Sequence, residues 1–236
     1  MGIKTKFREA AVDRFGFVLL ACVATYIILV AVDQSQYSGL AGALPVLVTV
    51  LLTINASNPG PAARYTALGL VTGAVIVGSI SAGINDARVF GVAMELAGFA
   101  LGVCIVLILL RMAEHMKVTV QTVLAVLAAY VMFGLFFTFI DSGIGHISGH
   151  FFAQSGAHSQ SDYAYLSYIT LTTVGFGDLT PGTGIARSII ILEALMGQIF
   201  LVTLVARMVS LLGTERSPMS AQRALQSDEE GRDAPE

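Results

Sequence analysis

The chain has 236 residues, of which 55% are hydrophobic and 12% are charged, and its mean hydropathy is +0.77. An ordinary soluble domain carries roughly 25% charged residues, so this composition excludes a water-soluble globular protein. It predicts an all-α protein of the membrane, surrounded by lipid and without a nucleic-acid partner. The net charge of −3 is less informative than the distribution of charge along the chain.

Six apolar runs follow a polar and basic N-terminal segment, and each run predicts one transmembrane helix. The second run is marginal in length and contains Pro45, which a span tolerates only where neighbours satisfy the freed carbonyl. Cys22 and Cys104 lie inside apolar runs and are expected to be small buried hydrophobes. The N-terminal segment covers residues 1–14, and the runs cover residues 15–32, 39–54, 65–84, 89–110, 118–140 and 185–212.

The first four runs predict a tightly packed four-helix bundle over residues 15–117. Gly69 and Gly73 in the third run are four residues apart, as are Gly98 and Gly102 in the fourth. Small residues at this spacing let the backbones of two membrane helices approach each other closely.

Glu95, also in the fourth run, is costly in hydrocarbon. Two interpretations of this carboxyl group stay open, a residue near the membrane interface and a functional group. The fourth run contains no Lys or Arg between residues 89 and 110.

Residues 141–160 are rich in glycine, serine and histidine and predict a segment without helical structure. His146 and His150 would suit a metal or proton site if they shared a helix, but Gly145 and Gly149 disfavour such a helix. We therefore keep a histidine site only as a minor alternative.

A short amphipathic helix is expected over residues 162–171, with Ser161 or Asp162 at its N-cap. A glycine-containing turn and the sixth apolar run follow it. The polar tail, residues 213–236, is expected to be disordered.

The turn reads Thr172-Thr173-Val174-Gly175-Phe176-Gly177-Asp178. Its glycines can adopt positive φ angles that let successive backbone carbonyls point the same way, and a column of carbonyls can replace the water shell of K+. The seven residues resemble the selectivity filter of the potassium channel family, in which Tyr usually stands where this chain has Phe176. The order of span, short helix, turn and span is also that of the family.

The resemblance implies a pore domain over residues 118–212 that forms a homotetramer around a central pore. The backbone carbonyls of four residues would bind K+, the transported ion, and no organic cofactor is implied. These residues are Thr173, Val174, Gly175 and Phe176, with the Thr173 hydroxyl at the inner end. Gly177 would line the outer mouth.

Several side chains are expected to support this filter, because Phe176 lacks an anchoring hydroxyl and the chain has no Trp. The tyrosines of the short helix are the expected substitutes, and the filter is expected to be less rigidly held. Glu193 is expected behind the short helix, protonated and hydrogen-bonded to Thr170 or Thr172, because an unpaired buried charge is costly. The supporting residues are thus Thr172, Asp178, Tyr163, Tyr165, Tyr168 and Glu193.

Gly197, in the sixth run, matches the position where the family often has a hinge glycine. It could equally allow close contact between helices. Gln198 is the candidate for a polar side chain that lines the cavity below the filter.

The distribution of basic residues predicts the orientation in the cell membrane. With six spans, eleven of the thirteen Lys and Arg residues lie on one side, and only Arg88 and Arg187 lie on the other. The positive-inside rule then puts both termini in the cytoplasm and the outer mouth, with Asp178, outside.

The sequence therefore predicts a channel that conducts K+ passively and selectively. The fourth run lacks the repeated basic residues of a voltage sensor, and the gating stimulus and any regulatory partner stay open. The alternatives are a nonselective monovalent cation channel of the same architecture and, less favoured, a transporter or a nonconducting membrane scaffold. An enzyme is not expected, because the sequence shows no nucleophile with its base, metal-ligand cluster or phosphate-binding loop.

Overall fold

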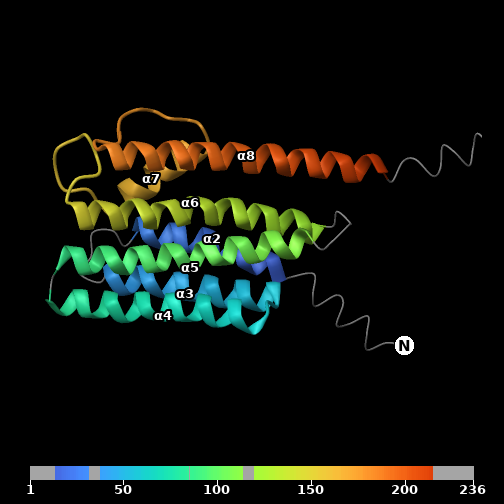
Figure 1. Cartoon of the computed structure of the whole chain (residues 1–236), viewed down its shortest axis with the longest axis horizontal. Coiled ribbons are helices and arrows are strands. Elements are labelled where there is room, and N and C mark those ends of the chain that lie inside the picture. The colour runs from blue at the N-terminus through green and yellow to red at the C-terminus, as the bar shows by residue number, and fades with distance from the viewer. Residues whose placement is uncertain (1–13, 32–37, 85, 114–119, 215–236) are drawn as a thin grey trace, which may run out of the picture.

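A computed structural model of the chain describes residues 14–31, 38–84, 86–113 and 120–214. The predicted N-terminal segment and tail, apart from residues 14, 213 and 214, lie outside these ranges. Seven helices run through the described residues, and in Figure 1 the long helices lie side by side along one axis. They are α2 (Arg14–Ala31), α3 (Ser38–Ser57), α4 (Pro61–Ile84), α5 (Ala87–Ala113), α6 (Val120–Ser148), α7 (Gln160–Leu171) and α8 (Gly184–Thr214).

The helices α4, α5, α6 and α8 are each long and apolar enough to cross a membrane. The described apolar parts of α2 and α3 are shorter, Phe15–Ala31 and Leu44–Ser57. The chain is therefore an all-helical, multi-pass membrane protein, and the full count of six spans stays a prediction.

Glycines bring α5 and α6 into close contact. A Cβ at Gly98 would lie 2.9 Å from Ile140 Cδ1, and a Cβ at Gly102 would lie 3.1 Å from the ring of Phe136. This predicted pair does allow close approach. The pair in α4 differs: a Cβ at Gly73 would lie 3.6 Å from Leu96 Cδ1, an ordinary contact, and Gly69 is exposed with no atom within 4 Å of its Cβ position, so the prediction is wrong for Gly69.

The helix α6 continues eight residues beyond its predicted end at 140, so the expectation of a non-helical segment over 141–160 is wrong for residues 141–148, while residues 149–159 are non-helical as expected. Glycines inside this extension serve packing. A Cβ at Gly143 would lie 2.7 Å from the carboxyl group of Glu95, and Gly145 lies against the hydroxyl of Tyr163. The helix ends where Gly149 has a φ of +76°, a conformation that commonly terminates helices.

The short helix α7 lies between α6 and α8 (Figure 1). The first helix also contacts it, because the rings of Tyr26 and Tyr168 meet edge-on with 4.8 Å between their centroids. Both the bundle and the last two spans therefore fix the position of α7 and of the loop that follows it.

Candidate functional site

The helix α7 begins earlier than predicted, with Ser159 rather than Ser161 or Asp162 at the N-cap position. Asp162 contributes from within the first turn, where its carboxylate accepts a hydrogen bond of 2.9 Å from the Ser159 backbone N–H. Gln160, the first residue of α7, is joined to α6, because Ser142 Oγ donates to Gln160 Oε1 at 2.6 Å. These bonds fix the start of the helix that carries the loop.

The loop 172–178 leaves α7 through a tight backbone turn. The amides of Val174 and Gly175 both donate to the carbonyl of Ile169, at 2.9 and 3.1 Å. Thr173, Gly175 and Gly177 have φ angles of +59°, +52° and +79°, whereas the residues between them do not have positive φ. This alternation is the backbone condition for successive carbonyls to point the same way.

The carbonyl oxygens of residues 173–177 have no hydrogen-bond partner within the described part of the chain. The loop is also exposed in the single chain, with Val174 53% and Phe176 71% accessible. Backbone carbonyls are strong acceptors that proteins rarely leave unused. Five consecutive oxygens are therefore available to a ligand outside this chain.

The outer end of the loop is anchored by Asp178. Tyr165, on α7, directs its hydroxyl between the two Asp178 carboxylate oxygens, at 3.0 and 2.9 Å. The ring of the same tyrosine lies parallel to Phe176, with 6.5 Å between centroids and 3° between planes. Of the three tyrosines predicted around the loop, Tyr165 is the one whose hydroxyl bonds to it.

Gln154 is a further support that the sequence did not reveal. Its side-chain amide donates to the Asp178 carbonyl at 2.9 Å and accepts the Thr180 backbone N–H at 3.1 Å. Two backbone bonds between residues 151–153 and 180–182 continue this attachment. A glutamine in a polar segment carries no signal of its own, so only the folded chain shows its role.

Behind α7, a polar contact joins three helices. Ser167 Oγ lies 2.8 Å from the carbonyl of Gly134 on α6 and 2.5 Å from Glu193 Oε1 on α8. A hydroxyl has one proton and a carbonyl only accepts, so both bonds form together when the Glu193 carboxyl is protonated and donates.

The predicted position of Glu193 behind the short helix agrees with the structure, but its predicted partners, Thr170 and Thr172, do not. Ser167 faces α8 instead, and the Thr172 hydroxyl bonds to the Tyr168 carbonyl of its own helix. Glu193 Oε2 and both carboxyl oxygens of Asp141 are buried without a hydrogen-bond partner among the described residues.

The inner end of α7 is fixed by Tyr130 and Gly197. The Tyr130 hydroxyl, on α6, donates to the carbonyl of Leu171 at 3.1 Å. A Cβ at Gly197 would lie 2.7 Å from Leu171 Cδ1, so glycine lets α8 touch the last residue of α7. The alternative of close helix contact thus has a structural basis, while the hinge role of Gly197 and the cavity role of Gln198 stay predictions.

The histidines do not form the minor alternative site. His146 lies in α6 and its Nδ1 is 2.7 Å from the Ser142 carbonyl, whereas His150 lies beyond the end of that helix. Within the described ranges, no group of three or more His, Cys, Asp or Glu residues is placed to hold a metal ion.

Residues 125–213 match a family model described as ion channel. The match begins in α6 and covers α7, the 172–178 loop and most of α8. This segment is similar to ion channels, and the matched family is one of channels rather than of enzymes. The helices α2–α5 lie outside the matched ion channel segment, and a comparison with curated proteins finds no match.

Proposed function

We propose that four copies of this chain form a potassium-selective channel whose filter is the 172–178 loop. The observation that carries this proposal is the run of five carbonyl oxygens without partners, in a loop anchored at both ends, within the ion channel segment. The sequence of the loop, which resembles the potassium channel filter, selects K+ among the possible ions.

In this channel, the carbonyls of four residues from each copy replace the hydration shell of K+. The ring of oxygens closes only when several chains contribute, because one chain supplies one oxygen at each level. The residues are Thr173, Val174, Gly175 and Phe176, with the Thr173 hydroxyl below them and Gly177 at the outer mouth.

The exposed face of α8 supports assembly into a tetramer. In the most apolar stretch of α8, 17% of the residues are buried within one chain, a share close to the 22% of the peripheral helix α4 and far below the 61% of α6. Large apolar side chains occupy this face, and they include Ile185, Ile191, Leu192, Leu195, Ile199 and Val202. Packing of α8 against neighbouring copies would bring four loops to one axis.

The position of α7 would favour a cation below the filter. Its C-terminal end, at Leu171, carries the negative end of the helix dipole. Gln198, exposed on α8, would add a polar side chain to the cavity wall. With both termini in the cytoplasm, as the positive-inside rule indicates, K+ would pass from this cavity outward through the filter.

Potassium flux from liposomes that contain the purified protein tests the proposal. We expect K+ efflux that barium blocks, and no efflux from a Gly175→Ala variant, because its φ of +52° strains any residue with a Cβ. Gly184→Ala is the matched control, since Gly184 has no atom within 4 Å of its Cβ position and no positive φ is recorded for it. Absence of flux from the unmodified protein would favour the scaffold alternative. Equal K+ and Na+ flux would favour a nonselective channel.

A further inference from the structure

The ring of His158 lies between two acceptors in the segment that connects α6 to α7. Its Nε2 atom is 3.1 Å from the Gln154 carbonyl oxygen, and its Nδ1 atom is 3.5 Å from Asp162 Oδ2. The ring also packs on Phe152, with 4.2 Å between centroids, and 16% of the His158 side chain is exposed. The imidazole is therefore held in one place and is still open to protons from the aqueous side.

Both neighbours can only accept hydrogen bonds, since one is a backbone carbonyl and the other is a carboxylate. A neutral imidazole carries one N–H, so in either tautomer it serves one neighbour and turns a lone pair toward the other. An imidazolium carries two N–H groups, and it donates to Gln154 and pairs with Asp162 at the same time. The surroundings of His158 are thus complete only when the ring is protonated.

We propose that His158 is a proton-binding site, and that its proton fastens the outer end of the filter loop to α7. The connection runs through Gln154, whose side-chain amide donates to the Asp178 carbonyl at 2.9 Å and to Thr180 Oγ1 at 3.2 Å. The side-chain oxygen of Gln154 accepts the Thr180 backbone N–H at 3.1 Å. Because protonated His158 holds the Gln154 backbone next to Asp162, it joins these contacts to the first turn of α7.

Asp162 is a fixed partner for the charged ring. Its carboxylate also accepts the Ser159 backbone N–H at 2.9 Å, which is the capping contact at the start of α7. Loss of the His158 proton removes the ion pair and leaves a single neutral donor between two acceptors. The stabilising contact is therefore present at low pH and is lost as the pH rises through the range in which histidine ordinarily changes charge, about pH 5 to 8.

Among the described residues, Asp162 is the charged side chain in contact with His158. Arg187 donates to the Pro181 carbonyl at 3.3 Å, and His146 lies with its Nδ1 atom 2.7 Å from the Ser142 carbonyl of its own helix. The titratable or charged side chains on the elements packed around this segment are Asp162 and Tyr163 of α7, His146 of α6, Asp178 of the loop and Arg187 of α8.

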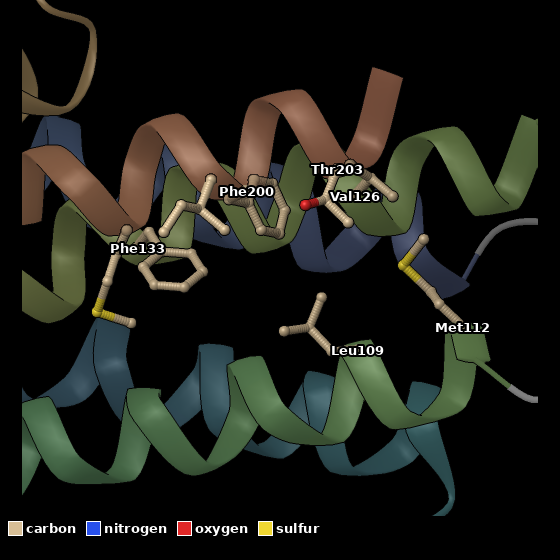
Figure 2. A pocket seen from close by; sticks show the side chains of 8 residues that line it. Leu109, Met112, Val126, Phe133, Phe200 and Thr203 are labelled. Atoms are coloured by element: carbon tan, nitrogen blue, oxygen red, sulfur yellow. The ribbon is translucent and has the colours of Figure 1, made fainter. Parts of the chain in front are cut away.

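The inner end of the loop is held differently. The Tyr130 hydroxyl donates to the Leu171 carbonyl at 3.1 Å, and the Tyr130 ring stacks on Phe200 with 6.0 Å between centroids. Phe200 also contacts Phe133, and both rings line an apolar cavity between α5, α6 and α8 (Figure 2). No histidine takes part in these contacts, so the proton of His158 acts on the outer end of the loop.

Hydrogen exchange of the purified protein in detergent tests the proton site without ion flux. The unmodified protein and His158→Gln are compared at about pH 5.5 and again at about pH 8, so that the intrinsic effect of pH on exchange cancels. The amides to follow are those of Ala153, Thr180 and Gly182, which bond across this attachment. We expect them to exchange about threefold more slowly in the unmodified protein at about pH 5.5, the order expected of a partly exposed ion pair, and equally in both proteins at about pH 8.

His150→Gln is the matched control, because its side chain is exposed and its hydrogen bonds are made by its backbone. It should match the unmodified protein at both pH values. Asp162→Asn keeps an oxygen for the Ser159 amide and removes the charge, so it should behave like His158→Gln. Equal exchange in the unmodified protein and His158→Gln at about pH 5.5, or the same difference at both pH values, would overturn the proton site.

The effect on conduction rests on the proposed function and is measured separately. Lowering the pH on the outer side of the filter from about 8 to about 5.5 should slow the decline of sustained potassium flux about threefold, and should have no such effect in His158→Gln. If exchange shows the proton site but the decline of flux does not respond to pH, the link to the filter is contradicted. A protein that conducts no K+ would instead contradict the proposed function, while the exchange result would still decide the proton site.

Discussion

Phe176 and Tyr165 together determine how the outer part of the loop is held. Phe176 has no hydroxyl, and its ring is 71% exposed in the single chain. Tyr165 supplies the missing polar contact from the helix side, because it stacks on Phe176 and bonds to Asp178. The outer loop is therefore held, in addition to the Gln154 contacts, by a tyrosine that lies outside the loop.

Phe176→Tyr tests whether the missing hydroxyl loosens the filter. We expect the variant to discriminate more sharply between K+ and Na+, or to lose conduction more slowly during sustained flux, because the added hydroxyl can be anchored by surrounding helices. Single-channel recording measures both properties. If neither changes, the filter is not held less rigidly by Phe176.

Tyr165→Phe removes the bond to Asp178 and keeps the aromatic ring. A hydrogen bond to a charged group is worth about 1.5–3 kcal/mol when buried, and less at this exposed site. We expect conduction to decline faster after its onset, as measured by potassium flux over time. Tyr65→Phe, which changes a 72% exposed tyrosine on α4, should behave like the unmodified protein. Equal decline in both variants would remove Tyr165 from the support of the loop.

At the scale of helices, the position of α7 depends on glycines of α6. A Cβ at Gly134 would lie 2.5 Å from the Tyr168 ring, and the Gly134 carbonyl accepts the Ser167 hydroxyl. A larger residue at this position must therefore move α7 together with the loop that follows it.

Gly134→Ala should lower the free energy of unfolding by about 1–3 kcal/mol, the usual cost of overpacking, and should reduce potassium flux. Thermal unfolding of the purified protein in detergent measures the first effect. Gly69→Ala is the matched control, because no atom lies within 4 Å of its Cβ position and alanine favours a helix. A Gly134→Ala protein with unchanged stability would show that α6 and α7 adjust without cost.

A helix could be predicted from the sequence where a local pattern of residues encodes it. Long apolar runs and the filter string are local patterns, so the apolar helices and the order of α6, α7, loop and α8 were predictable. The end of α6 could not be predicted. Glycines that make room for the side chains of Glu95 and Tyr163 cannot be distinguished in a sequence from glycines that end a helix. The pairing of Glu193 with Ser167 likewise depends on how α8 is rotated against α7, and no local pattern encodes that rotation.

For the whole molecule, the same chain combines a well-packed interior with an exposed α8 and a loop in which the carbonyls of residues 173–177 have no partner among the described residues. Within one chain, α5 and α6 bury 56% and 61% of their spans, whereas α8 buries 17%. The proposed tetramer would cover the exposed face of α8 and place the carbonyls of residues 173–177 around one axis.

The reversal potential of the purified protein in a planar bilayer, with a tenfold difference in K+ between the two sides and Na+ replacing the missing K+, tests the central claim most directly. If carbonyls of residues 173–176 from four chains replace the water shell of K+, a tenfold K+ gradient made with Na+ should shift the potential by about 59 mV toward the K+ equilibrium value. A reversal potential near zero under the same gradient would contradict a potassium filter.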